Sequence, residues 1–205
     1  EEYLGHSVEV GKLLSFDPGA LDKTWLKNCC AIGLSSSFVE PLEASSIGTS
    51  IQQAFLLSDR IVNYDEAVSE RYNKSVTAIV ENIRDFIALH YVTKRNDTPF
   101  WKDIQNIELP PRLKENLEVW RNKMPVKEDF MIGSDFTLFQ EFHHILILHG
   151  LGLFNQEAIR NEYELKLTQE SKEHAIHMIN NEVNPIAQTI PHKMMLQIIT
   201  STKDS

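Results

Sequence analysis

A glutamate and two serines stand where the sequence passes from a predicted strand into a predicted helix. Ser45 and Ser46 fall in the first turn of that helix, where backbone N–H groups lack helical partners and the helix dipole is positive. Such a turn can hold an anion. Glu43 lies just upstream, near enough to act on the same pocket as a base or as an orienting partner for a cation. The residues alone leave a plainer alternative open, in which Ser45 caps the helix and Glu43 is a surface carboxylate.

The elements that must position these residues are mostly helical. Short apolar runs at residues 8–16 and 25–34 predict two strands. After residue 45 the apolar residues recur every three or four positions, as on amphipathic helices. We therefore expect a mainly α fold with a small β contribution. The strands of residues 1–44 would belong to a sheet that lies largely outside this chain, and residues 45–205 would form a helical region. The expected helices span residues 45–62, 65–93, 110–120, 136–149, 157–167, 171–183 and 193–200.

Composition argues against several classes of function. The chain has 205 residues and a formal charge of −9 without a block of basic residues, which disfavours nucleic-acid binding. The longest mainly apolar stretch, residues 145–154, is too short to span a membrane. No secretion signal is visible, and the adjacent Cys29 and Cys30 cannot staple a long loop, so we expect a reduced, cytoplasmic setting. Because the chain opens at Glu1 without a methionine, we expect it to be part of a longer protein.

Histidines are numerous, but their spacing does not predict a metal site. His174 and His177 are three residues apart on a predicted helix, and His143, His144 and His149 cluster on another. Neither group has the His-Glu-x-x-His pattern or a partnered cysteine pair. We expect structural or surface roles for these side chains and no bound metal.

Two longer motifs resemble those of a known enzyme family. Residues 28–47 read Asn-Cys-Cys-Ala-Ile-Gly-Leu-Ser-Ser-Ser-Phe-Val-Glu-Pro-Leu-Glu-Ala-Ser-Ser-Ile. They are similar to the Asn-Cys-x-Ala-Ile-Gly-Leu and Gly-Phe-x-Glu-Pro-Leu-Glu-Ser-Thr-x-Ile segments of flavin-dependent tryptophan halogenases. Residues 86–91, Phe-Ile-Ala-Leu-His-Tyr, and residues 95–101, Arg-Asn-Asp-Thr-Pro-Phe-Trp, resemble further elements of the same family at similar spacing. The resemblance covers most of the chain and is strongest from residue 16 to residue 101.

The resemblance implies a two-part enzyme that halogenates an aromatic ring. One part binds reduced FAD, supplied by a separate flavin reductase, and uses oxygen with chloride or bromide to make hypohalous acid; a lysine then passes the halogen to the substrate. The Gly-x-Gly-x-x-Gly fingerprint and the family's Trp-x-Trp-x-Ile-Pro signature do not occur in this sequence. The chain therefore resembles the C-terminal portion of a halogenase and is expected to be inactive alone. The resemblance also leaves a homodimer open.

By the same resemblance, the strand-to-helix segment carries the catalytic and cofactor contacts. Glu43 matches the glutamate that works beside the lysine, positions the active halogen and accepts the proton displaced from the ring carbon. Ser45 and Ser46 match the two residues whose backbone amides hold the halide, where the family more often has Thr and then Gly or Asp. Ile47 matches a residue lying against the flavin, and Gly33 is assigned to the cofactor as well.

Substrate contacts are expected in the predicted helix of residues 136–149 and just beyond it. His143 and His144 stand where halogenases acting on free tryptophan have a tyrosine pair, and Phe154 is assigned to the substrate too. The glutamate that binds the ammonium group of tryptophan falls near Gly150 here, so the counter-charge is missing. We therefore expect free tryptophan to be a poor substrate, and an indole, a phenol, a pyrrole or a larger aromatic molecule to be a better one.

Two other classes of function remain open. Another flavin-dependent monooxygenase would share a helix-start anion site, whereas the Phe-Val-Glu-Pro-Leu-Glu run of residues 38–43 favours halogenation. A non-catalytic helical binding module would need residues 7–34 to form a self-sufficient sheet, which two strands rarely do. Halide-dependent product formation by the full-length protein separates a halogenase from another monooxygenase, whereas a monodisperse chain of 205 residues that melts cooperatively would favour the binding module.

Overall fold

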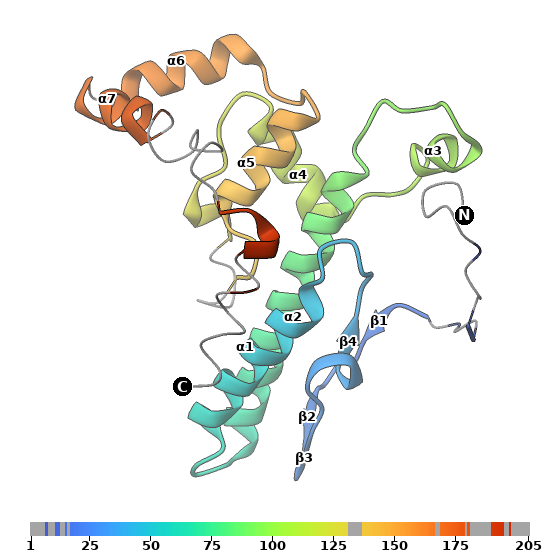
Figure 1. The fold of residues 1–205 in the computed structure, drawn as a ribbon. Coiled ribbons are helices and arrows are strands. Elements are labelled where there is room, and N and C mark those ends of the chain that lie inside the picture. Colours follow the sequence, from blue (N-terminus) through green and yellow to red (C-terminus); the bar gives the residue numbers. More distant parts are fainter. Residues whose placement is uncertain are drawn as a thin grey trace. The chain divides into compact units, whose positions relative to one another are not determined.

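The computed structural model describes residues 7, 11–12, 15, 17–130, 137–166, 169–178, 180, 190–194 and 197. The chain divides into two compact units, residues 1–155 and residues 156–205, and Figure 1 colours them along the sequence. In the described residues, the first unit contains four short strands and most of the helices, whereas the labelled elements of the second are helices. The mainly α architecture expected from the sequence is confirmed.

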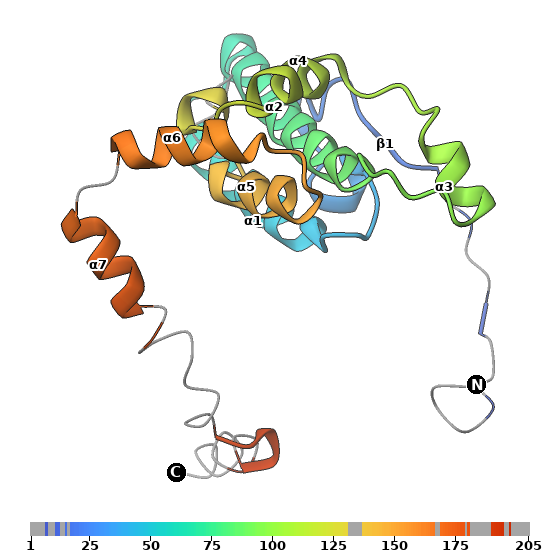
Figure 2. The ribbon, with the colours of Figure 1, turned by 90° about the horizontal axis from the view of Figure 1, so that it is seen from above.

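Two long helices form the core of the first unit. α1 spans Ser45–Arg60 and α2 spans Glu66–His90, and they lie side by side in Figures 1 and 2. The two helices run antiparallel. Near the start of α2, the Tyr72 hydroxyl donates to the carbonyl of Gln53 in the middle of α1 at 3.5 Å. The first turn of α1, in contrast, lines the same cavity as Ile83 in the second half of α2. The start of α1 is thereby placed against the C-terminal half of α2. The apolar face that α2 buries comprises Tyr72, Val76, Ile79, Ile83, Phe86, Ile87 and Leu89.

The strands form two separate two-stranded sheets. β1 (Gly19–Ala20) pairs antiparallel with β4 (Ser37–Phe38), and β2 (Trp25–Leu26) pairs antiparallel with β3 (Cys29–Cys30). The predicted single strand of residues 25–34 is therefore wrong. The chain reverses at Lys27, whose φ of 55° is left-handed, so that Trp25 pairs with Cys30. The strand predicted at residues 8–16 lies almost wholly outside the described residues.

Two buried asparagines of α2 tie other segments to the core. The Asn73 side chain accepts a hydrogen bond from the Trp25 N–H at 2.8 Å and donates one to the Trp25 carbonyl at 3.0 Å. Asn82 makes the same two bonds with Phe139, accepting at 3.0 Å and donating at 2.9 Å. Each asparagine side chain thus bonds both the N–H and the C=O of one residue, as a neighbouring strand would. Without these bonds, burial would leave the two backbone groups without hydrogen-bond partners. The β2–β3 hairpin is therefore anchored to α2.

Shorter helices complete the described chain. They are η1 (Gly33–Ser35), α3 (Pro99–Ile104), α4 (Pro111–Trp120), η2 (Lys127–Phe130), α5 (Glu141–Gly150), α6 (Gln156–Lys166) and α7 (Gln169–Met178). The sequence did not predict α3, which begins where Thr98 accepts a hydrogen bond from the Trp101 N–H at 3.4 Å. α5 begins at Glu141 rather than at residue 136, and the helix predicted at residues 193–200 falls partly outside the described residues. Among the described residues, no helix has both the length and the apolar character needed to cross a membrane.

Candidate functional site

The turn that carries Glu40 and Glu43 meets the C-terminal end of α2. Nε2 of His90 lies 2.9 Å from Oε1 of Glu43, and the Tyr91 hydroxyl donates a hydrogen bond to Oε1 of Glu40 at 2.7 Å. Two consecutive residues thus hold both glutamates of the Glu-Pro-Leu-Glu sequence. The Glu43 side chain is 35% exposed, so it is a partly exposed carboxylate that has a partner on α2.

The bond between Tyr91 and Glu40 also fixes the protonation of the phenol. The hydrogen bond to the Glu40 carboxylate, assisted by burial and by the charge of Glu40, raises the pKa of Tyr91 to about 12. The hydroxyl therefore keeps its proton, and keeps donating it to Glu40, at neutral pH. This bond holds the first glutamate of the turn in one position relative to α2.

The backbone bends sharply between Glu43 and α1. Ala44 is the N-cap of α1 and has φ 44° and ψ 33°, in the left-handed region, which costs a residue with a Cβ roughly 1–2 kcal/mol. Its N–H donates to the Pro41 carbonyl at 3.3 Å. Ser45 is the first helical residue, so the alternative in which its side chain caps the helix is wrong. The start of α1 has no side-chain cap from its N-cap residue.

A small cavity lies at this start of α1. Its volume is about 10 Å³, close to the least that one water-sized particle needs. Ser45 and Ser46 line the cavity together with Gly33, Ser37, Phe38, Val39, Thr49, Val80 and Ile83. A helix start presents backbone N–H groups and the positive end of the dipole, which is the kind of place where proteins bind anions. The structure therefore brings both predicted halide residues to one enclosed space.

The backbone of Gly33 is held by α1. Its N–H donates to Oε1 of Gln53 at 2.6 Å, and Ser36 bonds the same side chain, which is 0% exposed. This bond satisfies the one backbone donor of Gly33, so that donor is not open to a cofactor. Ile47, the other predicted flavin contact, is 74% exposed in the first turn of α1.

We expect Gly33→Ala to lower the free energy of unfolding by roughly 1–3 kcal/mol. The residue has a φ of +64°, and an added Cβ would lie 2.5 Å from Oγ of Ser50. Gly150→Ala is the matched control, because a Cβ there meets nothing within 4 Å. Urea unfolding followed by circular dichroism measures both variants. Equal stability of the two would show that the left-handed turn at Gly33 does not need glycine.

Phe86 connects the Glu43 turn with α5. Its ring lies edge-on to the ring of His90, with centroids 4.8 Å apart. On α5, the ring of His144 lies at 4.8 Å and that of His143 at 6.1 Å from the same phenylalanine. The structure thus brings two predicted substrate residues close to the histidine that pairs with the glutamate.

The three predicted substrate residues differ in their surroundings. Nδ1 of His143 accepts the Gln140 N–H at 3.0 Å in a capping box at the start of α5. His144 is 1% exposed, and its Nδ1 lies 2.9 Å from the Gln140 carbonyl. Phe154 is 9% exposed. Of the three residues, only His143 is partly exposed. Contact of these residues with a substrate stays a prediction.

Stability should fall in acid because His144 is buried among aromatic rings. Loss of hydration lowers its pKa from 6.5 to about 4. Between these two values the unfolded chain binds the proton and the folded chain does not, so stability falls as the pH drops from 6.5 to 4. We expect a loss of about 3 kcal/mol from this group. Urea unfolding at several pH values should show a flatter profile for His144→Phe; parallel profiles would contradict the assignment.

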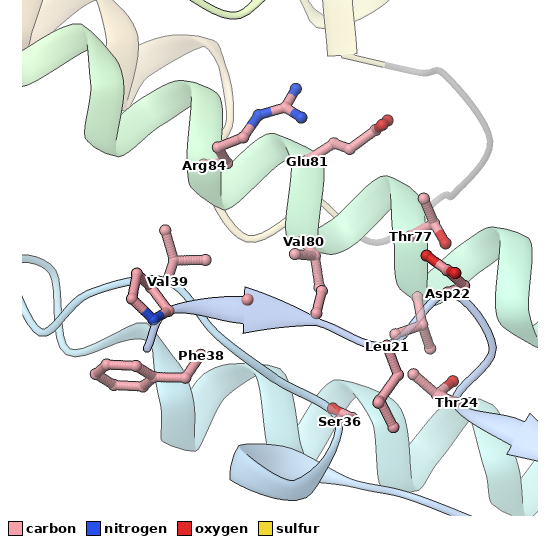
Figure 3. Close-up of a pocket in the computed structure, with 14 residues that line it drawn as sticks. Leu21, Asp22, Thr24, Ser36, Phe38, Val39, Thr77, Val80, Glu81 and Arg84 are labelled. Atoms are coloured by element: carbon pink, nitrogen blue, oxygen red, sulfur yellow. The ribbon is translucent and has the colours of Figure 1, made fainter. Parts of the chain in front are cut away.

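A larger cavity lies between the β1–β4 pair and α2 (Figure 3) and has a volume of about 440 Å³. Leu21 and Val76 contribute to its apolar lining, and Asp22, Glu81 and Arg84 contribute charged groups. Glu43, Ser45 and Ser46 do not line it. Phe38, Val39 and Val80 line both this cavity and the small one, so they separate the two. The predicted anion site is therefore distinct from the larger cavity.

Sequence reasoning missed the two residues that hold the glutamate turn. The Leu-His-Tyr sequence of residues 89–91 supported the family resemblance but predicted no role for His90 or Tyr91. One signal for His90 was present in the sequence, namely its position in the last turn of a predicted helix. The helix dipole favours a histidine there, and such a histidine is suited to face a carboxylate.

The solved structures that resemble this fold include flavin-dependent halogenases. One from Xanthomonas campestris aligns with a TM-score of 0.75 and 27% identity, over 94% of this chain and 38% of its own. Another, from Brevundimonas sp. BAL3, aligns with a TM-score of 0.69 and 27% identity, over 88% of this chain and 36% of its own.

Sequence comparison leads to the same class. The tryptophan halogenase family profile matches residues 2–163. The tryptophan 6-halogenase of Streptomyces albogriseolus is 31% identical over 156 residues, which cover 70% of this chain and 29% of that protein. The chain therefore belongs to the tryptophan halogenase family, and the family prediction made from its motifs is confirmed. It spans 26% of the length of the tryptophan 6-halogenase of Streptomyces toxytricini and 38% of the length of the tryptophan 7-halogenase of Lentzea aerocolonigenes.

Proposed function

We propose that this chain is the part of a flavin-dependent halogenase that carries the catalytic glutamate and the halide site. The observation that carries the proposal is the position of Glu43, held by His90 at 2.9 Å directly before the start of α1. In this proposal residues 1–44 end the FAD-binding domain and residues 45–205 form the substrate-binding region. The catalytic lysine would lie in the larger part of the relatives, which this chain does not match.

The residues present fit contact with one edge of a reduced FAD. Ile47 is 74% exposed in the first turn of α1 and offers an apolar side chain beside the anion cavity. Gly33 would act indirectly, since its N–H is bound to Gln53 and it lines that cavity. When bound, reduced FAD would supply, with oxygen, the oxidising power that turns chloride or bromide into an electrophilic halogen.

The chain's own residues would hold the halide and move a proton. The backbone N–H groups of Ser45 and Ser46 would bind the halide at the positive end of α1. When a carbon–halogen bond has formed, the ring carbon must lose its hydrogen to regain aromaticity. The Glu43 carboxylate would accept that proton, while the electron pair of the broken C–H bond returns to the ring.

The proposed substrate is an aromatic molecule other than free tryptophan. Gly150 stands near the place of the carboxylate that would bind the ammonium group of the amino acid, and the partly exposed His143 is the most accessible predicted substrate contact. The partners would be a flavin reductase acting in trans in the cytoplasm and a second copy of the enzyme. We expect indole, phenol or pyrrole to be turned over faster than tryptophan, and efficient turnover of free tryptophan would contradict this assignment.

The coding sequence directly upstream of the codon for Glu1 tests the proposal. We expect the reading frame to continue upstream of Glu1. Along the chain, the added sequence should contain a Gly-x-Gly-x-x-Gly strand and turn and then a Trp-x-Trp-x-Ile-Pro element with a nearby lysine. A start codon immediately upstream of Glu1 would contradict a catalytic role for this chain and favour the helical binding module.

A further inference from the structure

We propose that His90 positions the carboxylate of Glu43, a role that rests on the halogenase function proposed above. Nε2 of His90 is 2.9 Å from Oε1 of Glu43, and its Nδ1 is 2.9 Å from the Phe86 carbonyl oxygen. The imidazole therefore bridges a backbone group of α2 and the carboxylate. His90 acts on the reaction through Glu43, so it is a positioning residue.

The two partners of the ring are both acceptors. A carbonyl oxygen and an ionised carboxylate can only accept a hydrogen bond, so a ring nitrogen that bonds either of them donates its hydrogen. The bond from Nε2 to Glu43 ends on a carboxylate and is therefore charge-assisted. This bond uses Oε1 and leaves Oε2 as the oxygen that can take a proton from the substrate.

The ends of two helices favour this arrangement of charges. His90 is the last residue of α2, at the negative end of that helix dipole. Glu43 lies two residues before the first residue of α1, at the positive end of the other dipole. Because α1 and α2 run antiparallel, these ends meet, and Glu43 and His90 each lie at the favourable end of a helix dipole.

Neighbouring groups hold both members of the pair in place. The Phe86 ring lies edge-on to the imidazole at an interplanar angle of 88°, and the His90 side chain is only 18% exposed. The bond from Tyr91 to Glu40 holds the other end of the glutamate turn. Among the described residues, the titratable groups near His90 include Glu43, Glu40 and Tyr91 on the turn side, and His143 and His144 across Phe86.

Steady-state halogenation tests this role in the protein made from the complete reading frame that contains this chain. With indole and bromide, His90→Leu is expected to lower kcat roughly 10- to 100-fold, because the carboxylate loses its anchor. The KM for indole should stay unchanged. His90→Gln keeps an N–H donor for Glu43 and should recover most of the lost kcat. His149→Leu, at an exposed position near the end of α5, is the matched control and should leave kcat unchanged.

Nitrogen-15 spectra of the imidazole rings separate positioning from a purely structural role. Glu43→Gln is expected to shift the Nε2 resonance of His90 and to leave that of His149 in place. A wild-type protein that makes no halogenated product would overturn the proposed function, while the spectra would still test the His90–Glu43 pair. Two results would overturn the positioning role alone. One is an active wild type whose His90→Leu variant keeps full kcat, and the other is an Nε2 resonance of His90 that does not shift in Glu43→Gln.

Discussion

Glu43→Gln is expected to lower kcat for halogenation by roughly 10²- to 10⁴-fold in the protein made from the complete reading frame. The amide has the shape of the carboxylate, and its oxygen can still accept the hydrogen bond from His90, whose nitrogen lies 2.9 Å away. It cannot take a proton from the ring carbon. The KM for the aromatic substrate should therefore change little. Initial rates of brominated product, measured by mass spectrometry, give both parameters.

The control for this substitution is Glu118→Gln, which makes the same chemical change at an exposed position of α4. We expect it to leave kcat unchanged. If Glu43→Gln kept the activity of the control, the proton would have to leave through another group, and Glu43 would not be the base.

Asn73→Leu is expected to lower the free energy of unfolding by about 3 kcal/mol or more. The substitution keeps the approximate volume of the side chain but leaves the N–H and C=O of Trp25 without their partners, which lie at 2.8 and 3.0 Å in the native structure. The Thr24 hydroxyl loses its acceptor on the same side chain as well. Urea unfolding of the chain, followed by tryptophan fluorescence, measures the change.

Asn106→Leu is the matched control, because Asn106 is exposed and its side chain donates one bond to the carbonyl of Lys102 within α3 and the turn after it. We expect this variant to change stability by less than about 0.5 kcal/mol. A similar small effect of Asn73→Leu would mean that the β2–β3 hairpin is not anchored to α2 through this side chain.

The long helices were the predictable part of the fold, and the strands were not. α2 buries one apolar face, so its apolar residues repeat at three and four positions and mark the helix directly. The same repeat predicted α1, although Ile47, Ile51 and Phe55 of that repeat are exposed, whereas α1 buries Thr49, Gln53 and Leu56. The apolar run at residues 25–34 has the length of one strand. It folds instead as a hairpin, because Lys27 adopts a left-handed conformation and Asn73 supplies the hydrogen bonds that a longer strand pair would provide.

The candidate site also has a part that could be predicted from the sequence and a part that could not. The positions of Ser45, Ser46 and Glu43 at the start of α1 were predictable because small polar residues are followed there by a helical apolar repeat. The partner of Glu43 was not, since His90 reaches it only through the antiparallel packing of two helices. Nor could the sequence show that Gly33 gives its N–H to Gln53, because that bond joins residues 20 positions apart.

The most direct test of the central claim is halide incorporation by the protein made from the complete reading frame. The protein is incubated with FAD, a flavin reductase and its reductant, oxygen and an indole, phenol or pyrrole, with chloride, with bromide or without halide. We predict a product whose mass and isotope pattern change with the halide supplied, and no such product without halide. A product that gains oxygen regardless of halide would identify another flavin-dependent monooxygenase and contradict the assignment of the Ser45–Ser46 cavity as a halide site.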